Sequence, residues 1–162
     1  APDFLCLSKG LSGGYLPLSV VMTTDTIYQA FYDDKTAHAF LHSHSHSGNA
    51  LACRAALATL DIFEQHQIID ANKIKAAYLN KIAAPLAAHP KVIDFRNCGM
   101  IWAFEVETEE SDFAAKCFQA GLQQQLLLRP LGKTIYFMPP YVINEEEISM
   151  LVNGTLNALN SV

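Results

Sequence analysis

The sequence predicts an α/β chain that ends in a smaller α+β domain, and three observations support this fold class. Residues 4–7 form a short apolar run without alternation, which is typical of a strand buried on both faces of a parallel sheet. Helical periodicity then dominates residues 49–88. From residue 92 onward, short apolar runs alternate with helical patterns. We therefore predict two domains: residues 1–85 as the end of a large domain, and residues 86–162 as a small one.

The first third of the chain is predicted to hold strands, tight loops and one short helix. A second strand is predicted at residues 18–23, after a loop over residues 10–17. That loop contains three glycines and a proline, which favour the unusual backbone angles of a tight turn. Asp25 is the expected N-cap of a helix that runs to Tyr32. The following residues 35–47 are rich in histidine and serine, which predicts a polar loop.

Two long helices and then an α+β segment are predicted for the rest of the chain. Apolar residues recur at helical spacing over residues 49–65, and a second helix is expected over residues 69–88. A shorter helix is predicted at residues 111–123. Asn144 is expected to cap the last helix, whose first turn carries three glutamates that favour the helix dipole. The strands expected in this segment are residues 92–96, 100–106, 126–128 and 134–137.

Composition and charge exclude several classes of protein. The 162 residues are about half apolar and one sixth charged, a balance typical of soluble globular domains. The net charge of -5 provides no basic surface for nucleic acid, and no apolar run reaches the roughly 18 residues of a membrane helix. The four cysteines are widely spaced without a CxxC pair, which is typical of reduced thiols in a cytosolic protein. We therefore expect a cytoplasmic protein without nucleic-acid or membrane partners.

Lys9 is the first candidate for chemistry, because it follows the predicted strand 4–7 and precedes the glycine-rich loop. Ligands bind at the carboxyl ends of strands in open α/β sheets. A lysine at such an end can become partly buried, lose its proton and act as a nucleophilic amine. The spacing alone also fits a surface lysine at a strand end.

The segment around Lys9 carries a family resemblance. Residues 2–19, PDFLCLSKGLSGGYLPLS, closely resemble the cofactor-lysine segment of the class III pyridoxal-phosphate aminotransferases. The resemblance implies the aspartate aminotransferase-like fold of pyridoxal-phosphate transferases, with pyridoxal 5'-phosphate as the cofactor and a homodimer as the assembly. It also implies that Lys9 forms the internal aldimine with the cofactor and moves a proton between the substrate carbon and the cofactor.

A second candidate site is the loop of residues 42–53, HSHSHSGNALAC, which leads into the helix that Asn49 begins. Small hydroxyls and backbone N–H groups at a helix N-terminus suit a phosphate. The class III family has a matching loop, with Ser or Thr at the position of Ser45, that closes over the cofactor phosphate of the partner subunit. The resemblance implies that Ser45 and His44 bind the cofactor and that Ser43 lies near the substrate.

The same loop also allows a metal site. His42, His44 and His46 alternate, so an extended chain would present all three imidazoles on one face. Three imidazoles and a water form a known zinc pattern. No acidic residue stands nearby to orient such ligands, and we expect no metal here. Polar loop histidines without a ligand are the other interpretation, for His46 in particular.

The third candidate is the segment of residues 129–141, RPLGKTIYFMPPY. A guanidinium group binds a planar carboxylate through two parallel hydrogen bonds, so Arg129 is a candidate acid anchor, although an arginine before a proline is more often a surface residue. The segment closely resembles the diaminopelargonate-forming branch of the class III family, which makes a biotin precursor. The resemblance implies that Arg129 holds the carboxylate of the keto-acid substrate and that Tyr136 lines the same site.

The resemblance covers essentially the whole chain. It implies transfer of an amino group from S-adenosylmethionine to 8-amino-7-oxononanoate, which gives 7,8-diaminononanoate. Two alternatives remain, another class III aminotransferase that uses an ω-amino acid, and a non-catalytic module that binds a metal through its histidine loop. The family's phosphate cup, its stacked aromatic ring and its aspartate for the pyridine nitrogen cannot be assigned here. Because the chain starts without methionine and enters an apolar run at once, we expect it to begin inside a larger domain. Because those parts of the site are missing, we expect the chain to be inactive alone.

Overall fold

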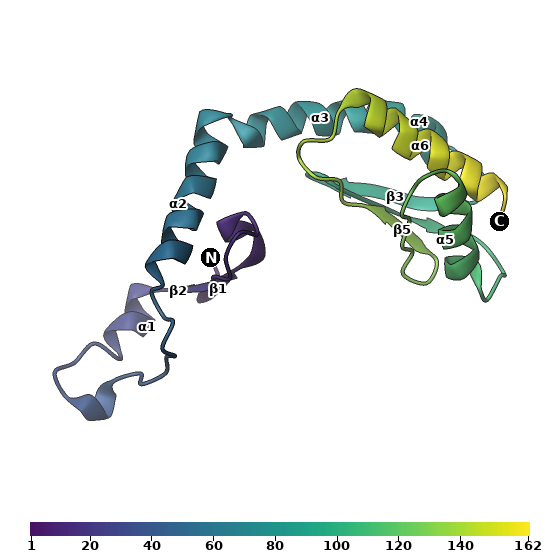
Figure 1. Cartoon of the computed structure of the whole chain (residues 1–162). Helices are drawn as coiled ribbons and strands as arrows, with labels where there is room; N and C mark the ends of the chain where they lie inside the picture. The colour runs from purple at the N-terminus through teal and green to yellow at the C-terminus, as the bar shows by residue number, and fades with distance from the viewer. The chain divides into compact units, whose positions relative to one another are not determined.

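The structure is a computed structural model that describes all 162 residues (Figure 1). The chain folds into two compact units, Ala1–Gln67 and Ile68–Val162, and each is described by itself. No helix in either unit is both long and apolar enough to cross a membrane. The predicted division into residues 1–85 and 86–162 concerns the domains of a complete enzyme and stays a prediction.

The first unit contains a two-stranded antiparallel sheet. β1 (Phe4–Leu7) pairs with β2 (Val20–Thr23), and Phe4 lies opposite Thr23. The Thr23 hydroxyl also donates a hydrogen bond to the carbonyl of Asp3 at 3.0 Å. Both strands lie where the sequence predicts them, although β2 begins at residue 20 rather than 18.

The apolar side chains of this sheet lie on the surface of the chain. Phe4 is 58% exposed, Val21 is 64% exposed, and every other residue of the two strands is exposed as well. The expected burial of residues 4–7 on both faces of a parallel sheet is therefore not found within these 162 residues. An unbroken apolar run predicts that a strand has apolar surroundings, but it does not predict which segment provides them. Here the partner strand is β2, which runs antiparallel to β1.

Four helical segments accompany the sheet in the first unit: the 3-10 turn η1 (Lys9–Ser12), α1 (Asp25–Gln29), the 3-10 turn η2 (Thr36–His38) and α2 (Ala50–Gln65). The N-cap of α1 is Thr24, whose hydroxyl accepts a hydrogen bond from the N–H of Ile27 at 3.5 Å, rather than the predicted Asp25. α1 also ends at Gln29, before the predicted Tyr32.

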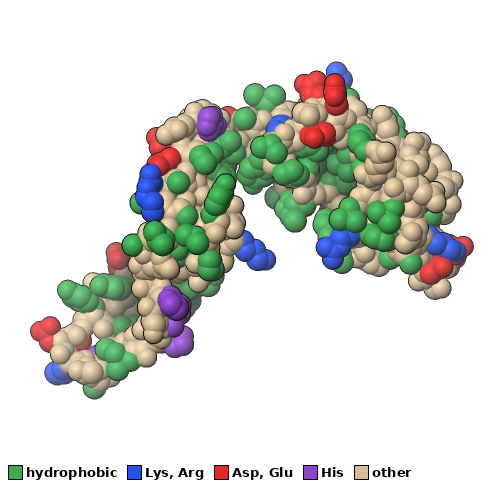
Figure 2. All heavy atoms as spheres, viewed as in Figure 1, with side chains coloured by type: hydrophobic (Ala, Val, Ile, Leu, Met, Phe, Trp, Pro, Cys, Tyr) green, Lys and Arg blue, Asp and Glu red, His purple; other side chains and the backbone are tan.

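α2 is the long helix of the first unit, and Asn49 caps it as predicted. The Asn49 side-chain oxygen accepts hydrogen bonds from the N–H groups of Leu51 at 3.0 Å and Ala52 at 3.3 Å. The buried residues of α2 are the small Ala52 and Ala56, and the helix packs against η1. Larger apolar side chains of α2, including Leu51 and Leu57, are exposed, and hydrophobic side chains gather over its visible face (Figure 2).

The second unit is built on an antiparallel sheet of three strands in the order β3-β4-β5 (Figure 1). The strands are β3 (Val92–Cys98), β4 (Ile101–Val106) and β5 (Thr134–Phe137). All three were predicted. The alternating burial of β4 and β5 shows that one face of this sheet belongs to the core, with Trp102 and Phe104 fully buried.

Four helices complete the second unit: α3 (Ile68–Ile82), α4 (Ala84–Ala87), α5 (Phe113–Gln123) and α6 (Glu145–Asn160). The helix predicted over residues 69–88 is divided between α3 and α4, because Pro85 lacks the N–H that a continuous helix would need and its ring clashes with the preceding turn. The N-cap prediction for α6 is confirmed, since Asn144 and Glu147 form a reciprocal capping box.

The predicted strand at residues 126–128 does not form. The N–H of Leu126 donates to the carbonyl of Gly121 at the end of α5, at 2.9 Å, instead of joining the sheet. Its side chain packs so tightly on α6 that a β-carbon on Gly154 would lie 2.6 Å from it. Leu126 and Leu128 are buried, so the apolar pattern reports core packing rather than strand pairing.

Candidate active site

Lys9 lies directly after β1 and begins η1, at the strand end where the sequence predicts it. Its φ angle is 52°, in the left-handed region that residues with a side chain rarely adopt. The hydroxyl of the preceding Ser8 donates to the carbonyl of Leu18 at 3.1 Å, which ties the end of β1 to the segment before β2. The Lys9 side chain is exposed in this chain, so its amine is open to an incoming aldehyde.

The turn after Lys9 is closed from within. Ser12 is 2% exposed, and its hydroxyl donates a hydrogen bond to the carbonyl of Leu16. Gly13 follows with a φ angle of 61° and approaches α2, where a β-carbon on the glycine would lie 3.1 Å from the hydroxyl oxygen of Thr59. The backbone of Lys9 therefore belongs to a turn that is seated on a long helix.

The predicted phosphate loop leads into the N-terminus of the same helix. Ser43, His44 and Ser45 are all exposed. The N–H of Ser47 donates to the carbonyl of His44 at 3.0 Å, and Gly48 turns the chain with a φ angle of 70°. Ser43 and Ser45 carry exposed hydroxyls, whereas the Ser47 hydroxyl accepts the N–H of His44 and Asn49 occupies the first N–H groups of α2.

The histidines of this loop are not arranged as metal ligands. No group of three or more His, Cys, Asp or Glu side chains in the chain could hold a metal ion. One ring nitrogen of His44 accepts a hydrogen bond from the N–H of His46 at 3.1 Å, which removes that nitrogen from coordination. Elsewhere in the unit, the backbone N–H of Lys35 and then the ring of His38 lower the pKa of the Asp33 carboxyl.

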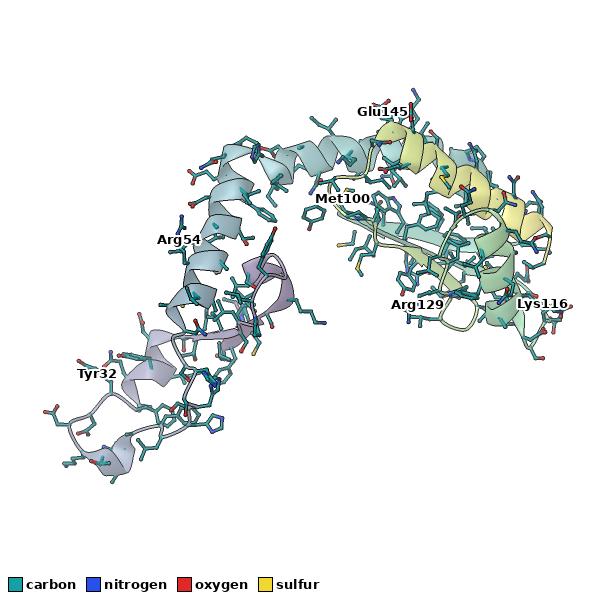
Figure 3. The ribbon with its side chains drawn as sticks, in the orientation of Figure 1. Tyr32, Arg54, Met100, Lys116, Arg129 and Glu145 are labelled. Atoms are coloured by element: carbon teal, nitrogen blue, oxygen red, sulfur yellow. The ribbon has the colours of Figure 1, made fainter.

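Arg129 and Tyr136 lie on the two arms of a tight hairpin in the second unit. Leu131 and Thr134 pair across the turn, with N–H···O distances of 2.9 and 3.0 Å. Tyr136 lies two residues beyond Thr134 within β5, and Arg129 lies two residues before Leu131 in a segment that forms no strand. Arg129 is exposed and lies on the side of the sheet away from α6 (Figure 3).

Apolar side chains make up most of the pocket next to Tyr136. Tyr136 is partly buried and stands opposite Ala103 in the register between β5 and β4. It also lines a pocket with Leu128, Met138 and Met150. Gln125 and Glu147 also line this pocket, whereas Arg129 is not among its lining residues.

The structure gathers the predicted site residues around two features. Lys9 sits in the turn packed on α2, and the loop with Ser43 and Ser45 leads into that helix, while the arginine and tyrosine share the hairpin of the second unit. The sequence reasoning did not single out Ser12 or Thr59. The only available signal was the position of Ser12 in the glycine-rich turn. The local sequence does not indicate that this polar side chain becomes buried, because the burial arises only when the turn folds.

The lysine after the strand, the glycine-rich turn and the arginine before the hairpin are the features on which the predicted class of aminotransferase depends, and comparison with known proteins gives the family. The sequence profile of the class III aminotransferases matches residues 1–159. The chain therefore belongs to the class III aminotransferase family. The predicted family, the predicted fold class and the prediction of an enzyme are confirmed by this match.

The most similar relatives point to one branch of the family. The adenosylmethionine-8-amino-7-oxononanoate aminotransferase of Helicobacter pylori is 48% identical over 99% of this chain. The enzyme of the same name from Synechococcus elongatus is 35% identical, also over 99% of this chain. In both cases the chain spans 38% of the relative's length, so it corresponds to a part of those enzymes.

Solved structures agree with the fold. The adenosylmethionine-8-amino-7-oxononanoate aminotransferase of Methanocaldococcus jannaschii matches with a TM-score of 0.87 and 34% identity, over 99% of this chain and 39% of its own. An omega transaminase from Pseudomonas jessenii, solved in complex with PMP, matches with a TM-score of 0.88 and 25% identity, over 99% of this chain and 38% of its own. Both proteins are transaminases longer than this chain, which covers 39% of the first and 38% of the second.

Proposed function

We propose that this chain supplies the cofactor lysine and the acceptor-binding arginine of an aminotransferase in biotin biosynthesis. The enzyme would transfer the amino group of S-adenosylmethionine to 8-amino-7-oxononanoate and give 7,8-diaminononanoate. The observation that carries the proposal is the 48% identity to the Helicobacter pylori enzyme over 99% of this chain, and the motifs around Lys9 and Arg129 support the choice of these two residues.

The residues of the first unit fit pyridoxal 5'-phosphate. The cofactor needs an amine for its aldehyde and hydrogen-bond donors for its phosphate. Lys9 offers an exposed amine at a strand end, and Ser45 offers a hydroxyl in an exposed loop before a helix N-terminus. When bound, the cofactor supplies an electron sink that stabilises negative charge on the substrate carbon. The carboxylate expected to pair with its ring nitrogen is assigned to no residue of this chain.

Each proposed site residue then has one task. Lys9 would hold the cofactor through Nζ, and its amine would accept and return a proton at the substrate carbon. Arg129 binds the carboxylate of the acceptor, and Tyr136 lines the path of its aliphatic chain. Ser43, His44 and Ser45 serve the substrate and phosphate side, in the partner subunit's site of a homodimer. We place this enzyme in the cytoplasm.

The test uses the complete enzyme, with the length of the curated relatives. Borohydride reduction and peptide mapping should find the pyridoxyl group on Lys9, and Lys9→Ala should abolish the visible absorbance of the bound cofactor. Mass spectrometry should then detect 7,8-diaminononanoate with S-adenosylmethionine as the donor. A pyridoxyl group on another lysine would refute the site.

The omega transaminase structures raise one alternative donor, since they share the fold at 25–28% identity. Turnover with an ω-amino acid, and none with S-adenosylmethionine, would select that alternative. The higher identity to the biotin-pathway relatives favours S-adenosylmethionine.

A further inference from the structure

We propose that Ser12 is a positioning residue for Lys9, and that it acts by closing the loop of residues 12–16, which directly follows the 3-10 turn that Lys9 begins. The proposal rests on the proposed function in one respect, because it takes Lys9 as the cofactor lysine. Ser12 lies three residues further along the same 3-10 turn, η1. Because the turn is one short hydrogen-bonded segment, we expect a change in the backbone at Ser12 to change the backbone at Lys9.

The first argument is the burial of a polar side chain in an otherwise open region. Ser12 is 2% exposed, whereas the side chains of Lys9 and Tyr15 are exposed. Its hydroxyl donates to the carbonyl of Leu16, and its own carbonyl accepts the N–H of Tyr15 at 3.2 Å. The hydroxyl and the carbonyl of Ser12 are therefore both used to close the segment that follows Lys9, and an alanine would leave the Leu16 carbonyl without this donor.

The second argument is the backbone conformation of Lys9 itself. A φ angle of 52° is unfavourable for a residue with a β-carbon, and such angles persist where the surroundings hold them. On the strand side of Lys9, the hydroxyl of Ser8 is bonded to the Leu18 carbonyl. On the other side, Ser12 closes the turn and Gly13 seats it on Thr59 of α2. Ser12 is the buried member of this set of contacts.

The third argument is chemical. A lysine that moves a proton must present its amine within hydrogen-bond reach of the reacting carbon. Loss of the Ser12 hydrogen bond would let the Lys9 backbone relax toward extended angles and displace the amine at the end of its long stem. A displacement of about 1 Å can slow a positioned reaction by about 100-fold, so we expect Ser12→Ala to slow each half-reaction by about 10- to 100-fold.

The test separates positioning from general damage by a double-mutant cycle in the complete holoenzyme. The variants are Ser12→Ala, Lys9→Ala and the double variant, and the measurement is the single-turnover rate of the donor half-reaction. Methylamine at saturating concentration replaces the missing amine in the two Lys9→Ala proteins. We expect Ser12→Ala to slow the single-turnover rate when Lys9 is present. In the Lys9→Ala background, where methylamine supplies the amine, we expect Ser12→Ala to change the rate by less than about twofold.

Two further variants keep the test decisive. Ser12→Thr retains the hydroxyl and should recover most of the rate, and Ser12→Cys, which keeps the size of the side chain but is a weak donor, replaces Ser12→Ala if the alanine protein does not fold. Ser149→Ala is the matched control, because its hydroxyl also donates to a carbonyl four residues away, that of Glu145 at 2.9 Å, on α6. It should leave both half-reactions unchanged.

The outcomes distinguish the two proposals. Equal slowing by Ser12→Ala with and without Lys9 would overturn the positioning role, because a structural defect does not depend on which amine moves the proton. Full activity of Lys9→Ala without methylamine would overturn the proposed function instead. A pH profile of the visible absorbance that Ser12→Ala shifts and Ser149→Ala leaves in place would support positioning.

Discussion

Gly13 lies so close to Thr59 that a β-carbon on the glycine would meet the threonine hydroxyl oxygen at 3.1 Å. The glycine also has a φ angle of 61°, which suits a residue without a side chain. The threonine is held in place, because its hydroxyl donates to the carbonyl of Ala55 at 3.1 Å within α2. This contact joins the turn that carries Lys9 to α2, the helix that follows the predicted phosphate loop.

Gly13→Ala should therefore loosen the Lys9 turn. The positive φ angle costs about 1–2 kcal/mol for alanine, and the contact with Thr59 adds to that cost. We expect faster amide hydrogen exchange in the peptide that covers residues 9–16, together with weaker cofactor retention. The measurement is native-state hydrogen exchange, which reports the free energy of local opening.

Gly14→Ala is the matched control for this prediction. Gly14 has a φ angle of 80°, but open space surrounds the position where its β-carbon would stand. Gly14→Ala should lower the free energy of local opening by the backbone cost alone. When Thr59→Ala is combined with Gly13→Ala, the loss in that free energy should fall to the same size. If the amides of residues 9–16 exchange equally fast in Gly13→Ala and Gly14→Ala while Thr59 is intact, the contact between Gly13 and Thr59 does not contribute to the stability of the turn.

Arg129→Ala should mainly weaken the half-reaction with the keto acid. Loss of a charge-assisted contact to a carboxylate costs on the order of 2–4 kcal/mol, or about 30- to 1000-fold in kcat/KM of that half-reaction. The donor half-reaction should change less, since S-adenosylmethionine is expected to bind differently. Stopped-flow measurement of each half-reaction checks this.

Arg54→Ala is the control for the arginine prediction. Arg54 lies on α2 and pairs with Asp61 at 3.5 Å on an exposed surface, so its loss should change neither half-reaction. Equal losses in the two half-reactions of Arg129→Ala would show that the arginine is no dedicated acceptor anchor.

Local patterns in the sequence predicted most of the helix starts and most of the strands. They did not predict which distant segments these elements contact. Asn49 and Asn144 were expected as caps and do cap their helices, because capping depends on residues within one turn. Residues 126–128 were expected as a strand, but Leu126 is held by Gly121 and packs on Gly154. Those contacts join distant segments, so no local pattern contains them.

The candidate site divides in the same way. Lys9 and Arg129 could be named from short motifs, and the structure places one at a strand end and the other at a hairpin. The seating of the Lys9 turn on Thr59 could not be predicted, because it joins residues 46 positions apart (59 − 13). The burial of Ser12 depends on the same tertiary contact, and composition alone describes its segment only as a loop.

Cys117 should make the second unit less stable at high pH. The thiol is fully buried on α5, and burial raises its pKa from 9.0 to about 11. Between these values the unfolded chain loses the proton while the folded chain keeps it, so the folded state is favoured below pH 9 and loses that advantage as the pH rises toward 11. Urea unfolding at several pH values should show this slope, and Cys117→Ala should remove it.

The same burial protects Cys117 from alkylation. Cys6, Cys53 and Cys98 are exposed in this chain, whereas Cys117 is buried, so iodoacetamide should reach Cys117 only after unfolding. Peptide mapping of native and urea-treated protein measures the difference. Rapid modification of Cys117 in the native protein would contradict the packing of α5.

The 162-residue chain alone should bind pyridoxal phosphate weakly and should not transaminate. Lys9 can still meet the aldehyde, but a single amine and an exposed loop do not fix the ring of the cofactor. The sheet next to Lys9 consists of β1 and β2 alone, and a two-stranded sheet with exposed apolar side chains is marginally stable and tends to associate. The test is to express residues 1–162, titrate them with pyridoxal phosphate, measure their mass in solution and assay both half-reactions. The complete enzyme serves as the positive control. Stoichiometric, tight binding with turnover would show that Lys9, its turn and the hairpin of Arg129 suffice for catalysis, and that the site needs no other part of the enzyme.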